Sequence, residues 1–330
     1  MKIVRVHEYG DADVMRVEDL PMPEPGPGEV RVRAEAIGVG VPDMLMRSGN
    51  YNWIPPFPFV PGNELAGTVD AVGAGVTRFR EGDRAFVSAR ELPARGGGYA
   101  EAFVVPAEAP FAMPDGVSAE QAVTLGNYQL GWLLLNYAAQ PQSGQTLLIH
   151  AAAGGAGSAL VQLAKRQGLT VFGIAGGADK ARYVSELGAD AVIDRNTEEI
   201  GERVAGLTGG NGVDFIYDSV AGPNFTKDFG MLGPMGMVVQ FGYIGGPPKG
   251  DIYKAMRATF GNSVALRLFS IHVLDDRPDI RRNAMEEAMA ALAAGEIAPR
   301  IHATLKLEQA ADSHRLLESG TVTGKVVLVP

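Results

Sequence analysis

Short runs of alternating apolar and polar residues occupy about the first 120 positions of the chain. Five of them are rich in β-branched residues and are bounded by glycine, proline or aspartate: residues 1–9, 29–39, 65–73, 83–89 and 100–107. A period of two over such lengths is typical of half-buried β-strands. The pattern predicts a compact β-rich module with long loops.

The period changes after Ser118. Ser118 followed by Gln121 has the spacing of a capping box, which predicts a helix running on through residues 121–139. Strands and helices then alternate. The expected strands are residues 145–151, 170–175, 191–195, 213–220 and 236–243, and the expected helices include 157–168 and 178–188. Such alternation indicates a parallel sheet with helices on both faces.

The C-terminal part returns to a mixed pattern. Residues 278–297 form an amphipathic pattern with Ile280, Ala284, Ala288 and Leu292 on one face, which predicts a helix. A strand, a helix and a final strand are expected within residues 302–330. A chain of 330 residues is long enough for two domains.

Composition narrows the function classes. The net charge is −9 without a long basic run, which argues against nucleic acid as a partner. The chain has no cysteine, so disulfides, thiolate metal sites and a cysteine nucleophile are excluded, and its five histidines are scattered. The N-terminus lacks an apolar signal core and no segment is long enough to span a bilayer. We therefore expect a cytoplasmic protein that does not act at a membrane.

Glycine is unusually frequent, with 43 residues against roughly 23 expected at an average of about 7%. The most informative glycines follow the strand at 145–151, where Ala151, Gly154 and Gly157 are spaced three residues apart. A glycine-rich turn between a strand and a helix is the context of a dinucleotide-binding fingerprint. Gly154 and Gly155 would let the backbone approach a pyrophosphate, and Gly157 would let the helix pack closely on the sheet. The alternative is a tight strand-to-helix corner without a ligand.

The tip of the next strand indicates which cofactor is preferred. A protein that prefers NAD usually has an acidic residue there, to accept from the ribose 2′-hydroxyl. Residues 175–177 contain no carboxylate, whereas Lys180 and Arg195 could both reach a 2′-phosphate. We therefore expect NADPH. The alternative is that both are ordinary solvated charges, and Asp179 argues mildly against NADPH.

Several segments resemble the medium-chain dehydrogenase/reductase superfamily: residues 40–51, 61–87, 96–106, 151–165, 188–194, 213–222 and 324–330. The similarity extends over essentially the whole chain and is greatest to the zinc-independent quinone oxidoreductase branch, which includes zeta-crystallin. This resemblance implies an α/β protein with a GroES-like β-rich catalytic domain plus a Rossmann doubly wound parallel-sheet domain. The GroES-like domain would comprise residues 1–121 and 268–330, and the Rossmann domain residues 122–267.

The resemblance also implies functional residues. The expected NADPH contacts are Gly154, Gly155, Ala156, Gly157, Lys180, Arg195, Gly222, Phe241, Gly242, Leu266, Arg267, Leu268 and Lys325. Backbone atoms of residues 266–268 would hold the nicotinamide carboxamide. Phe241 has the alternative of being plain core at the end of a strand.

Zinc-dependent members of the superfamily have cysteine at the position of Gly40 and histidine at that of Asn63, so we expect no metal. Quinone reductases usually have asparagine where this chain has Gly40, which is a departure from the family. Tyr51 matches an active-site tyrosine, with a packed loop aromatic as its alternative role. Asn127 is a weaker catalytic candidate near the nicotinamide.

The expected reaction is hydride transfer from NADPH to a quinone or an α,β-unsaturated carbonyl. Aromatic residues in the segment 50–59 would suit a small, flat, apolar substrate. An enoyl-thioester (enoyl-CoA) reductase and a non-catalytic NADPH-binding protein are the alternatives. The apolar run at 264–274 predicts an edge strand that pairs with its twin in a homodimer.

Overall fold

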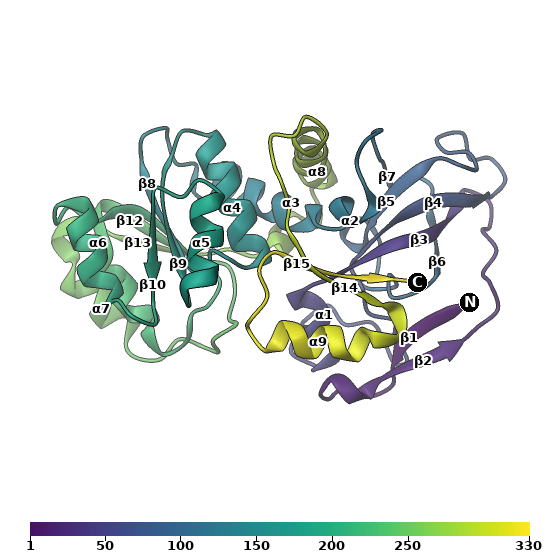
Figure 1. Cartoon of the computed structure of the whole chain (residues 1–330), viewed down its shortest axis with the longest axis horizontal. Helices are drawn as coiled ribbons and strands as arrows, with labels where there is room; N and C mark the ends of the chain where they lie inside the picture. Colours follow the sequence, from purple (N-terminus) through teal and green to yellow (C-terminus); the bar gives the residue numbers. More distant parts are fainter. The chain divides into compact units, whose positions relative to one another are not determined.

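The structure is a computed structural model that describes all 330 residues. It divides into two compact units (Figure 1). The first unit comprises Met1–Gly126 and Met285–Pro330, and the second comprises Asn127–Ala284. Both ends of the chain therefore build one unit, and the middle of the chain builds the other.

The first unit contains a seven-stranded sheet with the strand order β14-β15-β3-β4-β5-β7, in which β6 also pairs with β3. Its strands are β3 (Glu29–Val39), β4 (Glu64–Val72), β5 (Arg84–Ser88), β6 (Ala102–Pro106), β7 (Phe111–Ala112), β14 (Ile301–Lys306) and β15 (Lys325–Val329). A separate antiparallel pair consists of β1 (Lys2–Val6) and β2 (Met15–Asp19). The helices are α1 (Val41–Arg47), α2 (Ala119–Ala122) and α9 (Ala310–Glu318). This unit is β-rich, as expected.

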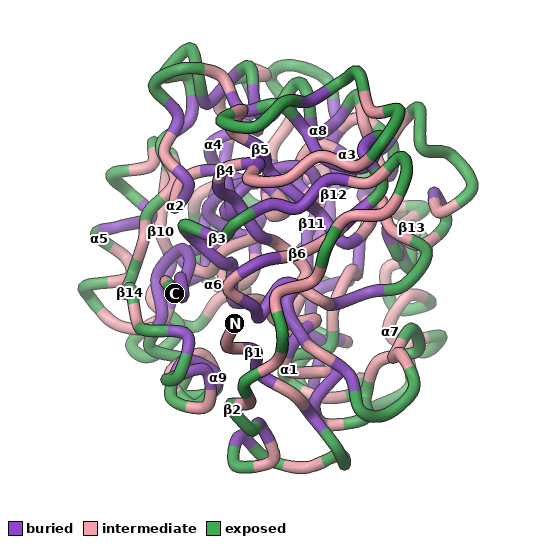
Figure 2. Tube along the Cα trace, turned by 90° about the vertical axis from the view of Figure 1, so that its right-hand side faces the viewer, coloured by how far each residue is buried: buried purple, intermediate pink, exposed green.

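The core of this unit follows from the alternation in the sequence. β3 is the central strand, and its Val30, Val32 and Ile37 are completely buried. Each such side chain contributes about 1.5–3 kcal/mol of transfer free energy. Tyr99 is also fully buried, and its hydroxyl lies 2.9 Å from Nε2 of His314. The strands hold most of the buried positions, whereas the connecting loops are mainly exposed (Figure 2).

The second unit contains a parallel six-stranded sheet with the order β10-β9-β8-β11-β12-β13. Its strands are β8 (Thr146–Ile149), β9 (Thr170–Ala175), β10 (Ala191–Asp194), β11 (Val213–Asp218), β12 (Leu232–Gln240) and β13 (Ala265–Leu268). The connecting helices are α4 (Gly155–Arg166), α5 (Ala178–Glu186), α6 (Ile200–Thr208), the 3₁₀ segment η4 (Gly222–Met231) and α7 (Ile252–Ala258). This is the Rossmann order 3-2-1-4-5-6, and its topological switch point lies between β8 and β11.

The helix expected to run from Ser118 through residue 139 is not continuous. Its capping box is present, because the Gln121 amide donates to Ser118 Oγ and the Ser118 amide donates to Gln121 Oε1. However, α2 ends at Ala122, α3 covers Leu125–Leu133, and a π-helical segment follows at Leu134–Ala139. The Thr124 hydroxyl donates to the Gln121 carbonyl at the break.

The unit boundaries lie after residues 126 and 284, whereas the sequence suggested 121 and 267. The second boundary falls inside helix α8 (Pro278–Ala293). The start of α8 stays with the second unit because Gln129 Nε2 donates to the Arg281 carbonyl at 2.8 Å, and the Arg281 guanidinium donates to the Leu274 carbonyl at 2.6 Å. None of the helices combines the length and the apolar character needed to cross a bilayer.

Candidate functional site

The glycine turn lies between β8 and α4, beside the switch point of the second unit. Ala151 has a positive φ of 49°, and the Gly154 amide donates to its carbonyl at 2.9 Å. A Cβ atom at Gly157 would lie 2.3 Å from the same carbonyl oxygen and 2.8 Å from Ala152 Cα. Only glycine fits at position 157, so the first turn of α4 packs directly on the backbone that precedes it. The first amides of α4 face the carboxyl edge of the sheet, where a parallel sheet of this order binds ligands.

Asn127 lies against this turn. A Cβ atom at Gly155 would be 2.5 Å from Asn127 Nδ2. The structure therefore brings the catalytic candidate Asn127 next to a predicted phosphate-binding residue within the same unit. A catalytic role for Asn127 remains a prediction.

Two cations gather at the tip of β9. The guanidinium of Arg195 lies over Gly176, where a Cβ atom would be 2.9 Å from Arg195 Nε. Burial lowers the pKa of Lys180, and the nearby charge of Arg195 lowers it further. Two like charges close together make the tip of β9 locally electropositive, and their contact with a cofactor phosphate remains a prediction.

The carboxylates near this tip do not oppose such a site. Asp179 is exposed and pairs with Arg182 at 2.7 Å. Asp194 accepts from the amides of Gly177 at 2.8 Å and Asn196 at 3.0 Å, which lowers its pKa. Both carboxylates are therefore occupied by partners of their own.

Gly222 and Gly242 belong to two loops that pack on each other beyond β11 and β12. The Gly222 amide donates to the Gly246 carbonyl at 3.0 Å, and a Cβ atom at Gly222 would be 2.8 Å from Gly245 O. A Cβ atom at Gly242 would be 2.7 Å from Ser219 O. Phe241 is half-buried and follows β12, which ends at Gln240. Both glycines are thus required for loop packing, whatever their contact with a cofactor.

The candidates Leu266, Arg267 and Leu268 lie on β13 at the edge of the sheet. Leu266 packs against the apolar core of the unit, whereas 64% of Leu268 is exposed. The Arg267 guanidinium donates to the Ala138 carbonyl, so this side chain serves the fold. A contact of the backbone of β13 with the nicotinamide remains a prediction.

A buried polar cluster lies in the first unit around Asp43. Its carboxylate accepts from the Gly40 amide at 2.8 Å, the Gly62 amide at 3.2 Å and Asn63 Nδ2 at 2.7 Å. Burial raises the pKa of Asp43 to about 6, with a further increase from Glu64 and a partial offset from Lys325. Asp43 therefore fixes the start of α1 and the loop that precedes β4.

Lys325, expected near the cofactor, is 4% exposed and forms an ion pair with Glu64. The two residues join β15 to β4, 261 positions apart in the chain. A Cβ atom at Gly40 would lie 3.7 Å from Lys325 Nζ. The ammonium group thus has a partner within the first unit, and its contact with a cofactor remains a prediction.

We expect Lys325→Met to lower the free energy of unfolding by about 3 kcal/mol, because it leaves the largely buried Glu64 carboxylate, 12% exposed, without its partner. Urea denaturation measures the change. Lys2→Met is the matched control, since Lys2 pairs with Glu308 on the surface and its loss should change the free energy of unfolding far less. Equal losses in the two variants would contradict the special role of the buried pair.

Tyr51 is half-buried and packs against the core of the first unit, with its ring 5.3 Å from that of Trp53. The neighbouring Phe57 and Phe59 stack with ring centroids 5.4 Å apart. Trp53 and Phe57 remain 39% and 42% exposed. The aromatic segment therefore has both a packed part and an accessible part.

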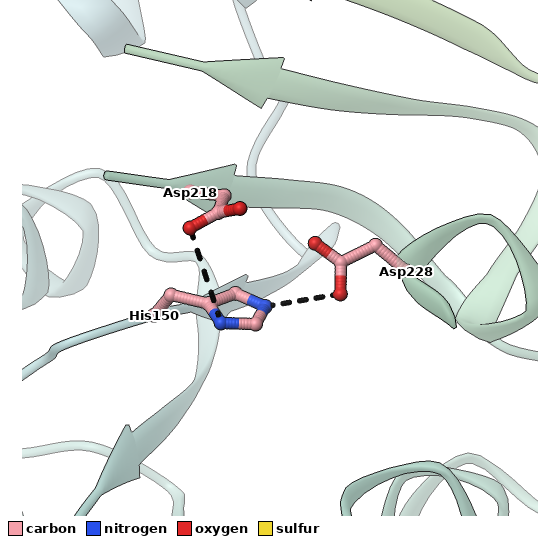
Figure 3. Close-up of side chains that lie close together, drawn as sticks. All are labelled: His150, Asp218 and Asp228. Carbon is pink, nitrogen blue, oxygen red and sulfur yellow. Dashed lines mark ion pairs between the residues drawn. The ribbon is translucent and has the colours of Figure 1, made fainter. Parts of the chain in front are cut away.

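One polar cluster was missed in the sequence: His150, Asp218 and Asp228 (Figure 3). His150 Nε2 lies 3.2 Å from Asp228 Oδ1, and His150 Nδ1 lies 4.0 Å from Asp218 Oδ1. Asp218 and Asp228 are 1% and 2% exposed. The sequence does place His150 directly after β8 and Asp218 at the end of β11, both apolar strands. This placement becomes informative only when β8 and β11 are known to be neighbours.

Comparison with known proteins assigns both units to families. Residues 26–115 match the model of the alcohol dehydrogenase GroES-like domain, and residues 155–293 match that of the zinc-binding dehydrogenase. A quinone oxidoreductase of Pseudomonas aeruginosa is 34% identical over 302 residues, which is 87% of each chain. The rat synaptic vesicle membrane protein VAT-1 homolog is 33% identical over 305 residues, 87% of this chain and 73% of the relative.

Solved structures agree with this assignment over the full length. A mycobacterial protein complexed with NADPH superposes with a TM-score of 0.89 at 33% identity, and the match covers 100% of both chains. The Escherichia coli quinone oxidoreductase complexed with NADPH also gives 0.89, at 27% identity, again over 100% of both chains.

The side chains at the position of the catalytic zinc in zinc-dependent relatives do not fit that metal. Gly40 offers no ligand, and Asn63 uses its amide nitrogen to donate to Asp43. Glu64 is bound to the ammonium group of Lys325, which lies beside Gly40. Zinc prefers thiolate, imidazole and carboxylate ligands, whereas this cluster already contains a positive charge of its own.

Proposed function

The chain belongs to the zeta-crystallin-like quinone oxidoreductase branch of the medium-chain dehydrogenase/reductase superfamily. From this premise we propose that it is an NADPH-dependent oxidoreductase that reduces quinones or α,β-unsaturated carbonyls. The observation that carries the proposal is the glycine turn at the switch point of the parallel sheet, together with the cation pair at the tip of β9. These features bind two different phosphate groups of the same cofactor.

The pyrophosphate is held by the turn at residues 154–157. Gly157 has no space for a side chain, and the Asn127 amide packs against Gly155 where a Cβ atom would lie. Backbone can therefore approach the phosphates closely, and the amides and dipole of the α4 N-terminus stabilise their charge. This cradle fits a dinucleotide.

The 2′-phosphate of NADPH is held by Lys180 and Arg195. Burial and the nearby charge of Arg195 lower the pKa of Lys180, and a bound phosphate would offset both effects. NADH has no 2′-phosphate and would not make this contact. The pair therefore supports a preference for NADPH.

Bound NADPH supplies a hydride from C4 of its nicotinamide. The chain must orient this group, exclude water and provide a proton. We assign the orientation to the backbone of residues 266–268, and the proton to Tyr51 or to solvent. A conjugated acceptor is already polarised, so the polar cluster at Asp43, Glu64 and Lys325 need not hold a metal.

The test is NADPH oxidation at 340 nm with a quinone, an enone and crotonyl-CoA side by side, and with NADH in place of NADPH as the control. Turnover of the quinone or enone supports the proposal. Turnover of crotonyl-CoA alone would identify an enoyl-thioester reductase. Tight NADPH binding without turnover of any acceptor would identify a non-catalytic NADPH-binding protein.

We further propose that the protein is a homodimer joined through β13. This strand has an unpaired edge, and Leu268 and Val273 are 64% and 66% exposed in and after it. Phe260, in the short helix just before the strand, is 82% exposed. Open edges and clustered apolar side chains of this kind are usually covered.

We expect light scattering to give twice the chain mass of 34.8 kDa. Val273→Asp should shift the molecule toward the monomer, because it would place a charge in an apolar surface that the partner subunit covers in the proposed dimer. The matched control is Val17→Asp on β2 of the first unit, which is 43% exposed and should leave the dimer intact. A monomeric wild-type protein would contradict the proposal.

A further inference from the structure

The cluster of His150, Asp218 and Asp228 presents an electrostatic problem. Two carboxylates are almost completely buried, and the imidazole lies between them, with Asp228 at its Nε2 and Asp218 at its Nδ1 (Figure 3). The other charged group that acts on His150 is Arg195, beyond the end of β10. Buried carboxylates are costly unless a positive charge or hydrogen bonds compensate them.

Hydrogen bonds compensate the two carboxylates unequally. Asp218 accepts from the amides of Val220 at 2.6 Å and Ala221 at 3.0 Å. Asp228 Oδ2 and His150 Nε2 are buried and have no hydrogen-bond partner, since the Nε2–Oδ1 contact of 3.2 Å is close but not aligned as a hydrogen bond. Asp228 therefore relies on the charge of His150.

The cluster is linked to each loop at the switch point. The His150 amide donates to the Tyr217 carbonyl, and His150 directly precedes the glycine turn. Asp218 holds the turn in which Ala221 has a positive φ of 54°. The Phe241 amide donates to the main-chain carbonyl of Asp218 at 2.9 Å, so the loop after β12 begins beside the same residue.

We propose that His150 is a positioning residue that acts as a buried imidazolium. Its positive charge holds Asp218 and Asp228 together and so fixes the loops around the cofactor phosphates. The affinity for NADPH then depends on whether His150 is protonated. The proposal rests on the proposed function for its ligand. With the proton the cluster has a net charge of −1, and without it a net charge of −2, which repels an anionic cofactor.

The direction of the pH effect follows from the surroundings. Burial lowers the pKa of His150 and so does Arg195, but Asp228 and Asp218 outweigh both and raise it above its ordinary value of 6.5. The stabilisation from the protonated form is present below the unfolded pKa and is lost as the pH rises through the folded pKa. NADPH should therefore bind more weakly above that pKa.

The experiment compares NADPH dissociation constants of the wild type and His150→Gln from pH 5.5 to 9. The titration of the cofactor's own phosphate affects both proteins equally, so it cancels in the ratio of their dissociation constants. We expect the wild type to lose about five- to tenfold in affinity across the pKa of His150, as one charge within about 10 Å would produce, and His150→Gln to lack this step. Asp228→Asn should move the step to lower pH.

NMR titration of the cofactor-free protein measures the pKa of His150 directly, with its signal assigned by its absence from His150→Gln. His7→Gln, in the first unit, is the control that should leave the affinity profile unchanged. A pKa at or below 6.5, or coincident affinity profiles for the wild type and His150→Gln, would overturn the proposal. So would a cation such as Mn²⁺ or Zn²⁺ that raises the melting temperature of the wild type but not of Asp228→Asn.

Failure of the proposed function would look different. In that case NADPH would not bind at any pH, and the proposed link between His150 protonation and NADPH affinity would be wrong. The NMR titration would still decide whether His150 is an imidazolium. Urea denaturation as a function of pH would still show whether His150 stabilises the second unit.

Discussion

Gly157→Ala should weaken NADPH binding by about 10- to 100-fold, because a misplacement of bound groups by about 1 Å has effects of this size. The added Cβ would lie 2.3 Å from the Ala151 carbonyl oxygen and 2.8 Å from Ala152 Cα. Both neighbours are backbone, so the start of α4 must shift away from the turn. Isothermal titration calorimetry with NADPH measures the loss.

The matched control is Gly206→Ala, which makes the same substitution in helix α6 of the same unit. A Cβ atom at Gly206 meets nothing within 4 Å. Alanine should therefore stabilise α6 by about 0.5–1 kcal/mol and leave NADPH affinity unchanged. Overpacking at Gly157 should instead cost about 1–3 kcal/mol of stability. Unchanged NADPH affinity in a folded Gly157→Ala protein would contradict the assignment of the phosphate-binding turn.

Arg195→Ala should reduce kcat/KM for NADPH by about 10- to 100-fold, since hydrogen bonds to charged groups contribute about 1.5–3 kcal/mol. The value for NADH should stay nearly constant, because NADH has no 2′-phosphate. Lys180→Ala should act in the same direction. Initial rates with both cofactors and one acceptor measure the change in preference.

Arg182→Ala is the control for charge alone. Like Lys180, Arg182 is a cation of α5, but it is exposed and pairs with Asp179. Its removal should leave the NADPH-to-NADH ratio within about twofold of the wild type, as exposed pairs contribute little. Equal losses for NADPH and NADH in Arg195→Ala would show that Arg195 acts on structure and not on the 2′-phosphate.

Much of the fold is encoded locally and could be predicted from the sequence. The alternation of strands and helices from residue 145 onward predicts the parallel sheet, and each predicted strand is present within a few residues. The order strand, glycine-rich turn and helix in the sequence was enough to predict that Gly157 lets the helix pack closely on the sheet. The return of the chain end to the first unit came from the family resemblance, since β15 pairs with β3 across nearly the whole sequence.

The parts that could not be predicted depend on contacts between distant residues. Lys325 was expected near the cofactor, and its ion pair with Glu64 requires the pairing of β15 and β4 with β3. His150 was one of five scattered histidines until the strand order placed β8 beside β11. The break between α2 and α3, where the Thr124 hydroxyl donates to the Gln121 carbonyl, is not revealed by helix propensity alone.

The central claim is that this chain transfers a hydride from NADPH to a conjugated acceptor. The most direct measurement is the stoichiometry of the reaction. Purified protein is mixed, in the absence of oxygen, with NADPH and a limiting amount of quinone or enone. The absorbance of NADPH at 340 nm is then followed. We predict the loss of one NADPH for each acceptor molecule reduced. Stable absorbance with both acceptors, in a protein shown by calorimetry to bind NADPH, would contradict the account.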